Sequence, residues 1–175
     1  MSVNVLKLID DFTKDYPVNV EGLGGTLGLR VSKDADLPDG ISGHLKRMDD
    51  DKYTISSNKS EHFYRQRFTL AHEIGHFVLH KSIVDKFGGV DDDVMYRSTT
   101  RGDIYNSEIA LEHEKQANSF AASLLMPERL VRKLVDEGQQ SIPLSSLYRA
   151  FQVSPSAMKW RLENLGLMSK VDPDK

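Results

Sequence analysis

Three histidines and a glutamate stand within one predicted helix, in the stretch RFTLAHEIGHFVLH. His72 and His76 are four residues apart, which on an α-helix places them about 6 Å apart along the axis and roughly 40° apart around it. Two imidazoles at that spacing can bind one metal ion. Glu73 can reach a water on that ion without binding the ion itself. This is the H-E-x-x-H pattern, in which the glutamate acts as a general base.

His80 continues the four-residue spacing, but it lies about 12 Å along the helix axis from His72. That is too far for both to bind one ion, so we exclude His80 as a third ligand. We expect instead a hydrogen-bonded histidine at the end of the helix, where a donor or a cation suits the exposed carbonyls. Three ionisable groups inside the apolar run from Leu70 to Leu79 would be costly to bury without a partner, which favours a metal site over a purely structural helix.

The third ligand has to come from another element. A catalytic zinc site has three protein ligands and one open position. The sequence has no cysteine, so the ligands must be histidine or carboxylate. The glycine and third histidine that follow some H-E-x-x-H motifs are absent. A second predicted helix, residues 108 to 125, offers four candidates: Glu108, Glu112, His113 and Glu114.

The apolar face of that second helix separates the candidates. Ala117, three residues beyond Glu114, belongs to this face, and Glu114 and Asn118 border it. Glu112 and His113 point further round the helix, where we expect exposure to solvent. A structural zinc is disfavoured, since such sites fill all four positions, typically with cysteine.

The elements that must position these residues predict an α+β fold, mostly helical, with a small antiparallel sheet. The motif helix runs from residue 61 to about 81. Before it we expect a helix at 3–13, then a connection, a strand at 26–32 and two strands within 40–58. After it we expect a flap-like surface loop at 82–105, the helices 108–125 and 127–137, and two short helices within 143–168 around a turn.

Length and composition bound the remaining choices. At 175 residues the chain fits one domain with a small appendage, and a net charge of −3 names no polyanionic or polycationic partner. No window approaches the roughly 20 apolar residues that span a bilayer, and the start of the sequence does not have the pattern of a signal peptide. These observations favour a cytoplasmic protein.

Two stretches together resemble a known family. RFTLAHEIGHFVLH followed by EKQANSFAASLLMP is similar to the ImmA/IrrE family of zinc-dependent metallopeptidases. The resemblance continues in YPVNVEGLGGTLGLRV, ISGH, YTISSN and VSPSAMKWRLENLGL, in that order, and covers nearly the whole chain. It implies that His72, His76 and Glu114 bind Zn²⁺ and that Glu73 is the general base. Asn118 stands where related peptidases place an acidic residue, and its amide could orient a histidine ligand.

The resemblance also implies a domain organisation and a function. It suggests a zincin-like metallopeptidase domain at residues 1–138 and a helix-turn-helix-like segment at 139–175 packed on it. Family members cleave helix-turn-helix repressors and so relieve repression in mobile elements, phages or stress responses. The function expected here is therefore a zinc endopeptidase that cuts such a repressor. The alternative is a peptidase-like regulatory module that binds a partner or DNA without proteolysis.

Two further expectations concern the substrate. The strand at 52–57 could pair with an extended peptide, and the tetrahedral oxyanion needs a donor, for which the candidates are Arg67, Tyr96, Arg97 and Tyr105. Residues 143–166 carry Arg149, Lys159 and Arg161 against Glu163, a net charge of +2. This is weak support for DNA contact, so packing or partner recognition is favoured over direct DNA binding.

Overall fold

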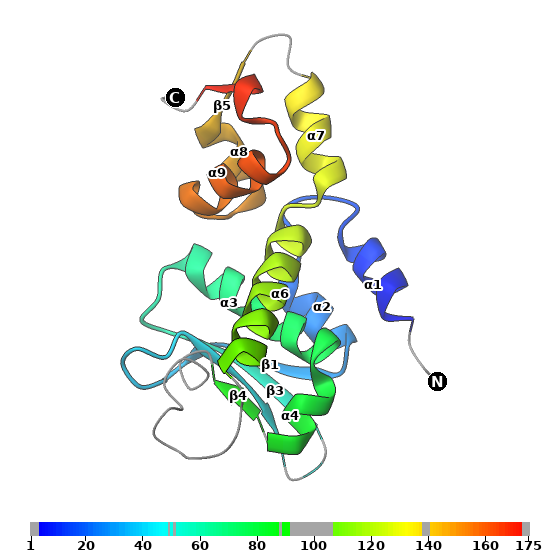
Figure 1. Cartoon of the computed structure of the whole chain (residues 1–175), viewed down its shortest axis with the longest axis vertical. Helices are drawn as coiled ribbons and strands as arrows, with labels where there is room; N and C mark the ends of the chain where they lie inside the picture. The colour runs from blue at the N-terminus through cyan, green and yellow to red at the C-terminus, as the bar shows by residue number, and fades with distance from the viewer. Residues whose placement is uncertain are drawn as a thin grey trace.

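The computed structural model describes residues 4–48, 50, 52–87, 89–91, 107–137 and 141–172. The fold is α+β and mostly helical, as the sequence predicts (Figure 1). The first part contains α1 (Val5–Phe12), α2 (Val20–Thr26), β1 (Leu29–Ala35), β2 (Gly43–Arg47), β3 (Tyr53–Asn58), α3 (Phe63–Leu79), α4 (Lys81–Phe87) and β4 (Gly89–Asp91). The second contains α6 (Ser107–Leu125), α7 (Glu128–Glu137), β5 (Ile142–Pro143), α8 (Leu144–Phe151), α9 (Pro155–Asn164), a 3₁₀ turn (Met168–Lys170) and β6 (Val171–Asp172).

The main sheet has the strand order β1-β3-β2-β4 and is mixed, which corrects the predicted antiparallel sheet. β2 and β3 form the expected hairpin, with Leu45 opposite Ile55. β1, however, runs parallel to β3, with Val31 opposite Ile55. The second strand of the hairpin, β3, therefore lies beside β1, and the first strand, β2, pairs with β4. Strand alternation alone does not reveal which strand of a hairpin a third strand joins.

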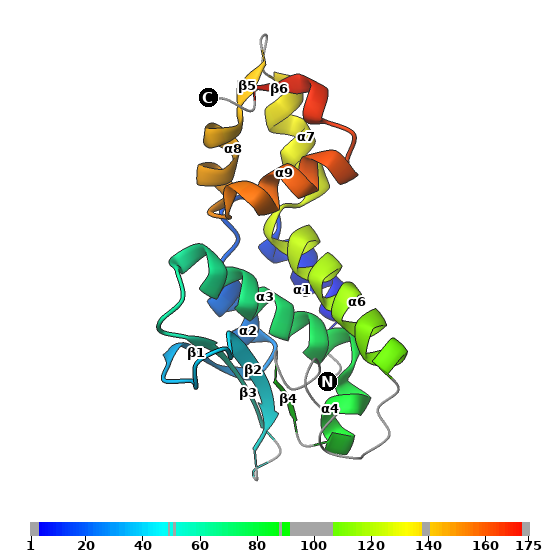
Figure 2. The same cartoon turned by 60° about the vertical axis from the view of Figure 1, so that its left-hand side comes forward.

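Helix α3 packs between the sheet and α6, where it is covered on both sides (Figure 2). Gly75 makes the close approach to α6 possible, because a Cβ there would lie 3.1 Å from Phe120 Cδ1 and 3.3 Å from the Ala117 backbone. Leu70, Ala71 and Ile74 of α3 are fully buried in the core. The helix that carries the motif is thus the central element of the fold.

The C-terminal helices α7, α8 and α9 form a lobe at one end of the molecule (Figures 1 and 2). The expected caps are present, since the Ser154 hydroxyl accepts the Ala157 N–H at 3.1 Å and Gly166 follows α9 with a φ of 68°. Buried side chains of this lobe, such as Leu147 and Met158, belong to the same hydrophobic cluster as those of α3. The helix-turn-helix character of residues 139–175 and the boundary at 138 stay predictions.

Three local differences from the sequence analysis are present. The expected connection after α1 contains helix α2, and the strand predicted at 26–32 begins at Leu29. The expected surface loop begins with helix α4 and strand β4, and its part from 92 to 105 lies outside the described residues. Among the helices of the described residues, none has the length and apolar content needed to cross a membrane.

Candidate metal centre

The structure brings His72, His76 and Glu114 together in the interior. The two Nε2 atoms lie 3.0 Å apart. Glu114 Oε2 is 3.1 Å from Nε2 of His72, and Glu114 Oε1 is 3.0 Å from Nε2 of His76. All three side chains are at most 7 % exposed. Among the residues that the structure describes, this is the one cluster of such side chains with ligand atoms close enough to hold an ion.

These separations fit a tetrahedral metal ion. Zinc–nitrogen and zinc–oxygen distances of roughly 2.0–2.1 Å in a tetrahedral site place the ligand atoms about 3.3 Å from one another. The observed 3.0–3.1 Å is close to that value. Two imidazoles and one carboxylate leave a fourth position for water or substrate, which is the composition of a catalytic site.

The charge state of the cluster suits a cation. Burial alone would raise the pKa of Glu114, but the hydrogen bonds and charges that His72 and His76 supply when their rings carry both protons outweigh it and lower that pKa to about 2. Burial lowers the pKa of His76, because a charged imidazolium is poorly solvated there. The carboxylate is therefore ionised and His76 neutral near pH 7, as metal ligands must be.

The outer nitrogens of both histidines have partners that select the tautomer. Nδ1 of His72 lies 3.1 Å from Oδ1 of Asn118, and since an amide oxygen can only accept, His72 donates from Nδ1. Its Nε2 then carries the lone pair that faces the cluster. The amide of Asn118 thus orients His72 as an acidic residue would, without a charge.

A series of contacts leads away from His76. Its Nδ1 is 3.1 Å from Nδ1 of His80, whose Nε2 is 3.0 Å from Oε1 of Gln116. Gln116 in turn donates to Oε1 of Glu112 at 3.3 Å. Since the Gln116 oxygen accepts, His80 carries its proton on Nε2 and accepts at Nδ1. His76 then donates from Nδ1 and presents the lone pair of Nε2 to the cluster.

His80 therefore has the predicted structural place and does not join the ligand group. It caps α3, where its backbone N–H donates to the carbonyl of His76, and its ring centroid lies 4.4 Å from that of His113, with the two rings tilted by 43°. Glu112 is exposed and His113 partly exposed, and the side chain of Glu108 lies outside the described part. The sequence did not predict that His80 would contact His76, although the i, i+4 spacing of the two residues was a usable signal.

Glu73 lies beneath strand β2. Its side chain is 1 % exposed, and a Cβ on Gly43 would stand 3.5 Å from its Oε1. Such a Cβ would also come within 2.2 Å of Thr69 Cγ2 and 2.5 Å of the Ser56 carbonyl oxygen. Only glycine allows β2 to run this close to α3. The carboxylate next to His72 is thus enclosed by the helix and the strand.

Arg67 is not directed toward the cluster. Its guanidinium donates to the carbonyl of Gln152 at 3.2 Å and to that of Val18 at 2.9 Å. Burial lowers its pKa, and the group is 7 % exposed. The described contacts make it a structural residue that ties α3 to the turn between α8 and α9. The other three oxyanion candidates, Tyr96, Arg97 and Tyr105, lie outside the described residues.

The predicted pairing of a substrate with the strand at 52–57 is wrong. β3 is an internal strand with β1 on one side and β2 on the other, so both of its edges are already used. Within the described sheet only β1 and β4 have an open edge. A substrate added to this sheet would have to pair there.

Comparison with known proteins agrees with this geometry. A family model, described as the IrrE N-terminal-like domain of the M78 peptidases, matches residues 36–163, a span that includes both α3 and α6. The chain belongs to this family. The match confirms the resemblance seen in the sequence.

This M78 chain is 34 % identical over 118 residues to the radiation response metalloprotease IrrE of Deinococcus radiodurans. The match covers 66 % of this chain and 32 % of that protein, so the chain spans about a third of its relative's length. A solved structure, a Mycobacterium tuberculosis transcriptional regulator, superposes with a TM-score of 0.53 and 18 % identity over 91 % of this chain and 46 % of that chain. At that identity the likeness concerns the fold alone.

Proposed function

We propose that this protein is a zinc-dependent endopeptidase. The observation that carries the proposal is the convergence of His72, His76 and Glu114, with their ligand atoms 3.0–3.1 Å apart, beside the buried carboxylate of Glu73. A zinc ion held by these three side chains would supply a Lewis acid for the scissile carbonyl and a water nucleophile at neutral pH.

Each residue of the centre has a distinct role in this proposal. His72 and His76 bind through Nε2, with their rings held by Asn118 and His80. The Glu114 carboxylate completes the ligand set and offsets part of the ion's charge. Glu73 accepts the proton of the attacking water and delivers it to the nitrogen of the leaving amine. The reaction is hydrolysis of a peptide bond.

The proposed substrate is a helix-turn-helix transcriptional repressor, whose cleavage would relieve repression. The support is the family to which the chain belongs, together with the resemblance of its motifs. The name of the D. radiodurans relative describes a metalloprotease in a radiation response. A regulatory role in the cytoplasm agrees with these observations.

The test uses the full chain, zinc and a repressor encoded beside it, with the products analysed by mass spectrometry. We expect one discrete cut. Glu73→Gln should abolish the cut while zinc binding stays within about twofold, because the glutamate moves a proton and binds no metal. His72→Ala should lose the zinc.

The same variants distinguish the alternative function. If Glu73→Gln leaves both the repressor intact and the biological output unchanged, the protein acts as a binding module and not as a peptidase. If Glu73→Gln still cuts the repressor, the assignment of the general base is wrong. Asp36→Asn serves as the matched control and should leave cleavage unchanged, because it changes an exposed carboxylate that pairs with Lys59.

A further inference from the structure

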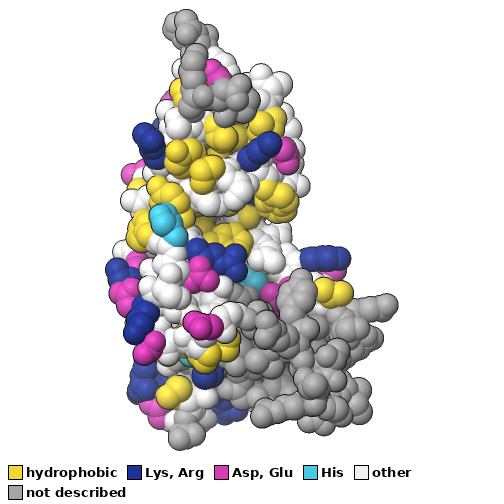
Figure 3. Space-filling view, turned by 90° about the vertical axis from the view of Figure 1, so that its left-hand side faces the viewer, with side chains coloured by type: hydrophobic (Ala, Val, Ile, Leu, Met, Phe, Trp, Pro, Cys, Tyr) yellow, Lys and Arg dark blue, Asp and Glu magenta, His cyan; other side chains and the backbone are white. Residues whose placement is uncertain are grey.

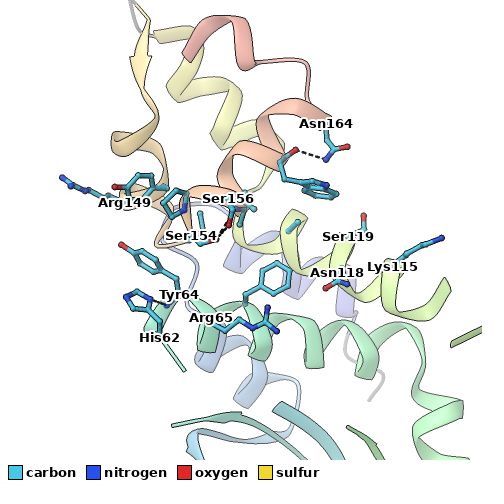
Figure 4. A pocket seen from close by; sticks show the side chains of 18 residues that line it. His62, Tyr64, Arg65, Lys115, Asn118, Ser119, Arg149, Ser154, Ser156 and Asn164 are labelled. Atoms are coloured by element: carbon cyan, nitrogen blue, oxygen red, sulfur yellow. Dashed lines mark hydrogen bonds between the residues drawn. The ribbon is translucent and has the colours of Figure 1, made fainter. Parts of the chain in front are cut away.

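A large groove separates the C-terminal helices from α3 and α6 (Figure 3). Its volume is about 1240 Å³, more than the roughly 300–1,000 Å³ of small-molecule pockets. One wall comes from α3 and α6, and the other comes from α8 and α9 (Figure 4). A space of this size fits a stretch of polypeptide better than a single small ligand.

The inner surface of the groove is apolar. Phe68, Met126, Tyr148 and Trp160 line it, and Trp160 remains 49 % exposed. Exposed apolar side chains that gather in a concave site, as this half-exposed tryptophan does with its neighbours, mark a binding site for a partner. Aromatic residues of this kind supply much of the binding energy of protein interfaces.

The charged residues of the groove have one sign. Arg65, Lys115 and Arg149 line it, and among the residues that the structure describes no aspartate or glutamate does so. Within the described part of the chain, none of the three forms a salt bridge, although Arg65 donates to the hydroxyl of Ser42 at 3.2 Å. The whole chain has a net charge of −3, so this local excess is not a general property of its surface. The groove is complementary to carboxylates.

The groove lies beside the metal centre, although the candidate ligands themselves do not line it. Phe68 lies one helical turn before His72 on α3, and Asn118 both lines the groove and contacts Nδ1 of His72 at 3.1 Å. Lys115 follows the candidate ligand Glu114 directly in α6. A chain held in the groove would therefore continue toward the site of hydrolysis.

We propose that this groove binds an acidic amphipathic segment of the substrate protein, with apolar side chains on Trp160 and Phe68 and carboxylates at Arg65, Lys115 and Arg149. The C-terminal helices then hold the substrate and form part of its recognition surface. The inference rests on the proposed peptidase function and names the class of sequence that the peptidase recognises. Nucleic acid is the weaker fit, because only three cations surround a deep apolar space, whereas phosphate backbones are bound by extended rows of cations.

Trp160 is the single tryptophan of the chain, so its fluorescence reports on the groove. The protein is the full chain with Glu73→Gln and bound zinc, in which binding is measured without turnover. The first probe is a peptide of about three helical turns with leucine and phenylalanine on one face and glutamate on the other. The second has lysine in place of each glutamate, and the third is a single-stranded oligonucleotide.

We expect the glutamate peptide to shift the Trp160 emission and to bind at least about tenfold more tightly than the lysine peptide or the oligonucleotide. Arg65→Glu with Arg149→Glu should weaken its binding by about tenfold or more, and added salt should weaken it further. Lys133→Glu, which changes an exposed residue of α7 outside the groove, should change the affinity for the glutamate peptide less than twofold. Trp160→Ala, measured by calorimetry, should also lose affinity.

The inference is overturned if the glutamate peptide fails to bind, if the lysine peptide binds as tightly, or if the double variant binds unchanged. Tighter binding of the oligonucleotide would assign the groove to nucleic acid instead. These outcomes are independent of whether the wild-type chain cuts a repressor, since they are measured in a variant without the general base. A failed cleavage assay with intact peptide binding would refute the proposed function alone.

Discussion

His80 offers a sharp test of how the metal centre is organised. In the proposed zinc-loaded protein, Nε2 of His76 would bind the ion, so its proton would be on Nδ1, which lies 3.1 Å from the acceptor Nδ1 of His80. His80→Phe keeps a ring of similar size but removes the acceptor. The Nδ1–H of a residue only 1 % exposed then has no partner, which costs about 1–3 kcal/mol. This corresponds to a loss of zinc affinity of roughly 10- to 100-fold.

The metal-free protein should not show the same loss. In His80→Phe without the ion, His76 can move its proton from Nδ1 to Nε2 and donate to Glu114, which lies 3.0 Å away. The free energy of unfolding in the presence of a chelator should therefore fall by less than about 1 kcal/mol, the range of a volume-conserving change. The penalty appears only when zinc occupies Nε2. This difference separates a tautomer effect from a simple packing defect.

The assay is competition for zinc against a chromophoric chelator at pH 7.5, combined with urea unfolding of the metal-free forms. Glu112→Ala, at the exposed end of the same series of contacts, is the control and should change affinity less than twofold. Asn118→Ala should resemble His80→Phe, because it removes the partner of the other histidine. If folded His80→Phe binds zinc as tightly as the wild type, the tautomer argument is refuted.

Three further outcomes follow from the described contacts. Arg67→Met should lower the free energy of unfolding by about 2–4 kcal/mol in urea titrations, since the carbonyls of Val18 and Gln152 lose a charged donor, and a change below 1 kcal/mol would contradict this. Gly43→Ala should cost about 2–3 kcal/mol in the same assay, because the new Cβ meets a backbone oxygen at 2.5 Å; an unchanged midpoint would show that β2 can move away. The metal-free protein should lose stability as the pH falls below 6.5, because the unfolded chain takes up a proton on His76 more readily than the folded chain. It should lose stability again between pH 4.5 and 2, where Glu114 is protonated. Glu114→Gln should flatten this second step, and an unchanged step would exclude Glu114 as its source.

The motif helix could be predicted from the sequence because its signal is local. Apolar residues at helical spacing and the four-residue separation of His72 and His76 define both the element and its chemistry. Helix α2 could not, since three of its seven residues are glycine, which has a low helix propensity. Packing overrides that propensity: at Gly24 a Cβ would lie 2.8 Å from Val31 Cγ2. The information that makes this segment helical lies in its neighbours.

The choice of the third ligand shows the same limit. The apolar face of 108–125 placed Glu114 at its border and Glu112 and His113 toward solvent, but only the family resemblance assigned Glu114 as the ligand. What decides in the structure is the rotation of α6 about its axis against α3. The approach at Gly75 fixes that rotation, so that Glu114 turns inward and Glu112 outward. The contact between α3 and α6 therefore sets the rotation of α6, and the sequence of either helix alone does not encode this rotation.

The hydrogen bonds of Arg67 connect the C-terminal helices to α3, the helix that carries His72 and His76. One of its two acceptors is the carbonyl of Gln152, the residue that turns α8 into α9. Truncation of the chain after residue 138 would remove the Gln152 carbonyl as an acceptor for the guanidinium of Arg67. This guanidinium is buried, and Arg67 lies five residues before His72. The shortened protein would have to rehydrate the cation by loosening the first turns of α3. We therefore expect loss of residues 139–175 to disturb the candidate metal centre although all three proposed ligands remain in the chain.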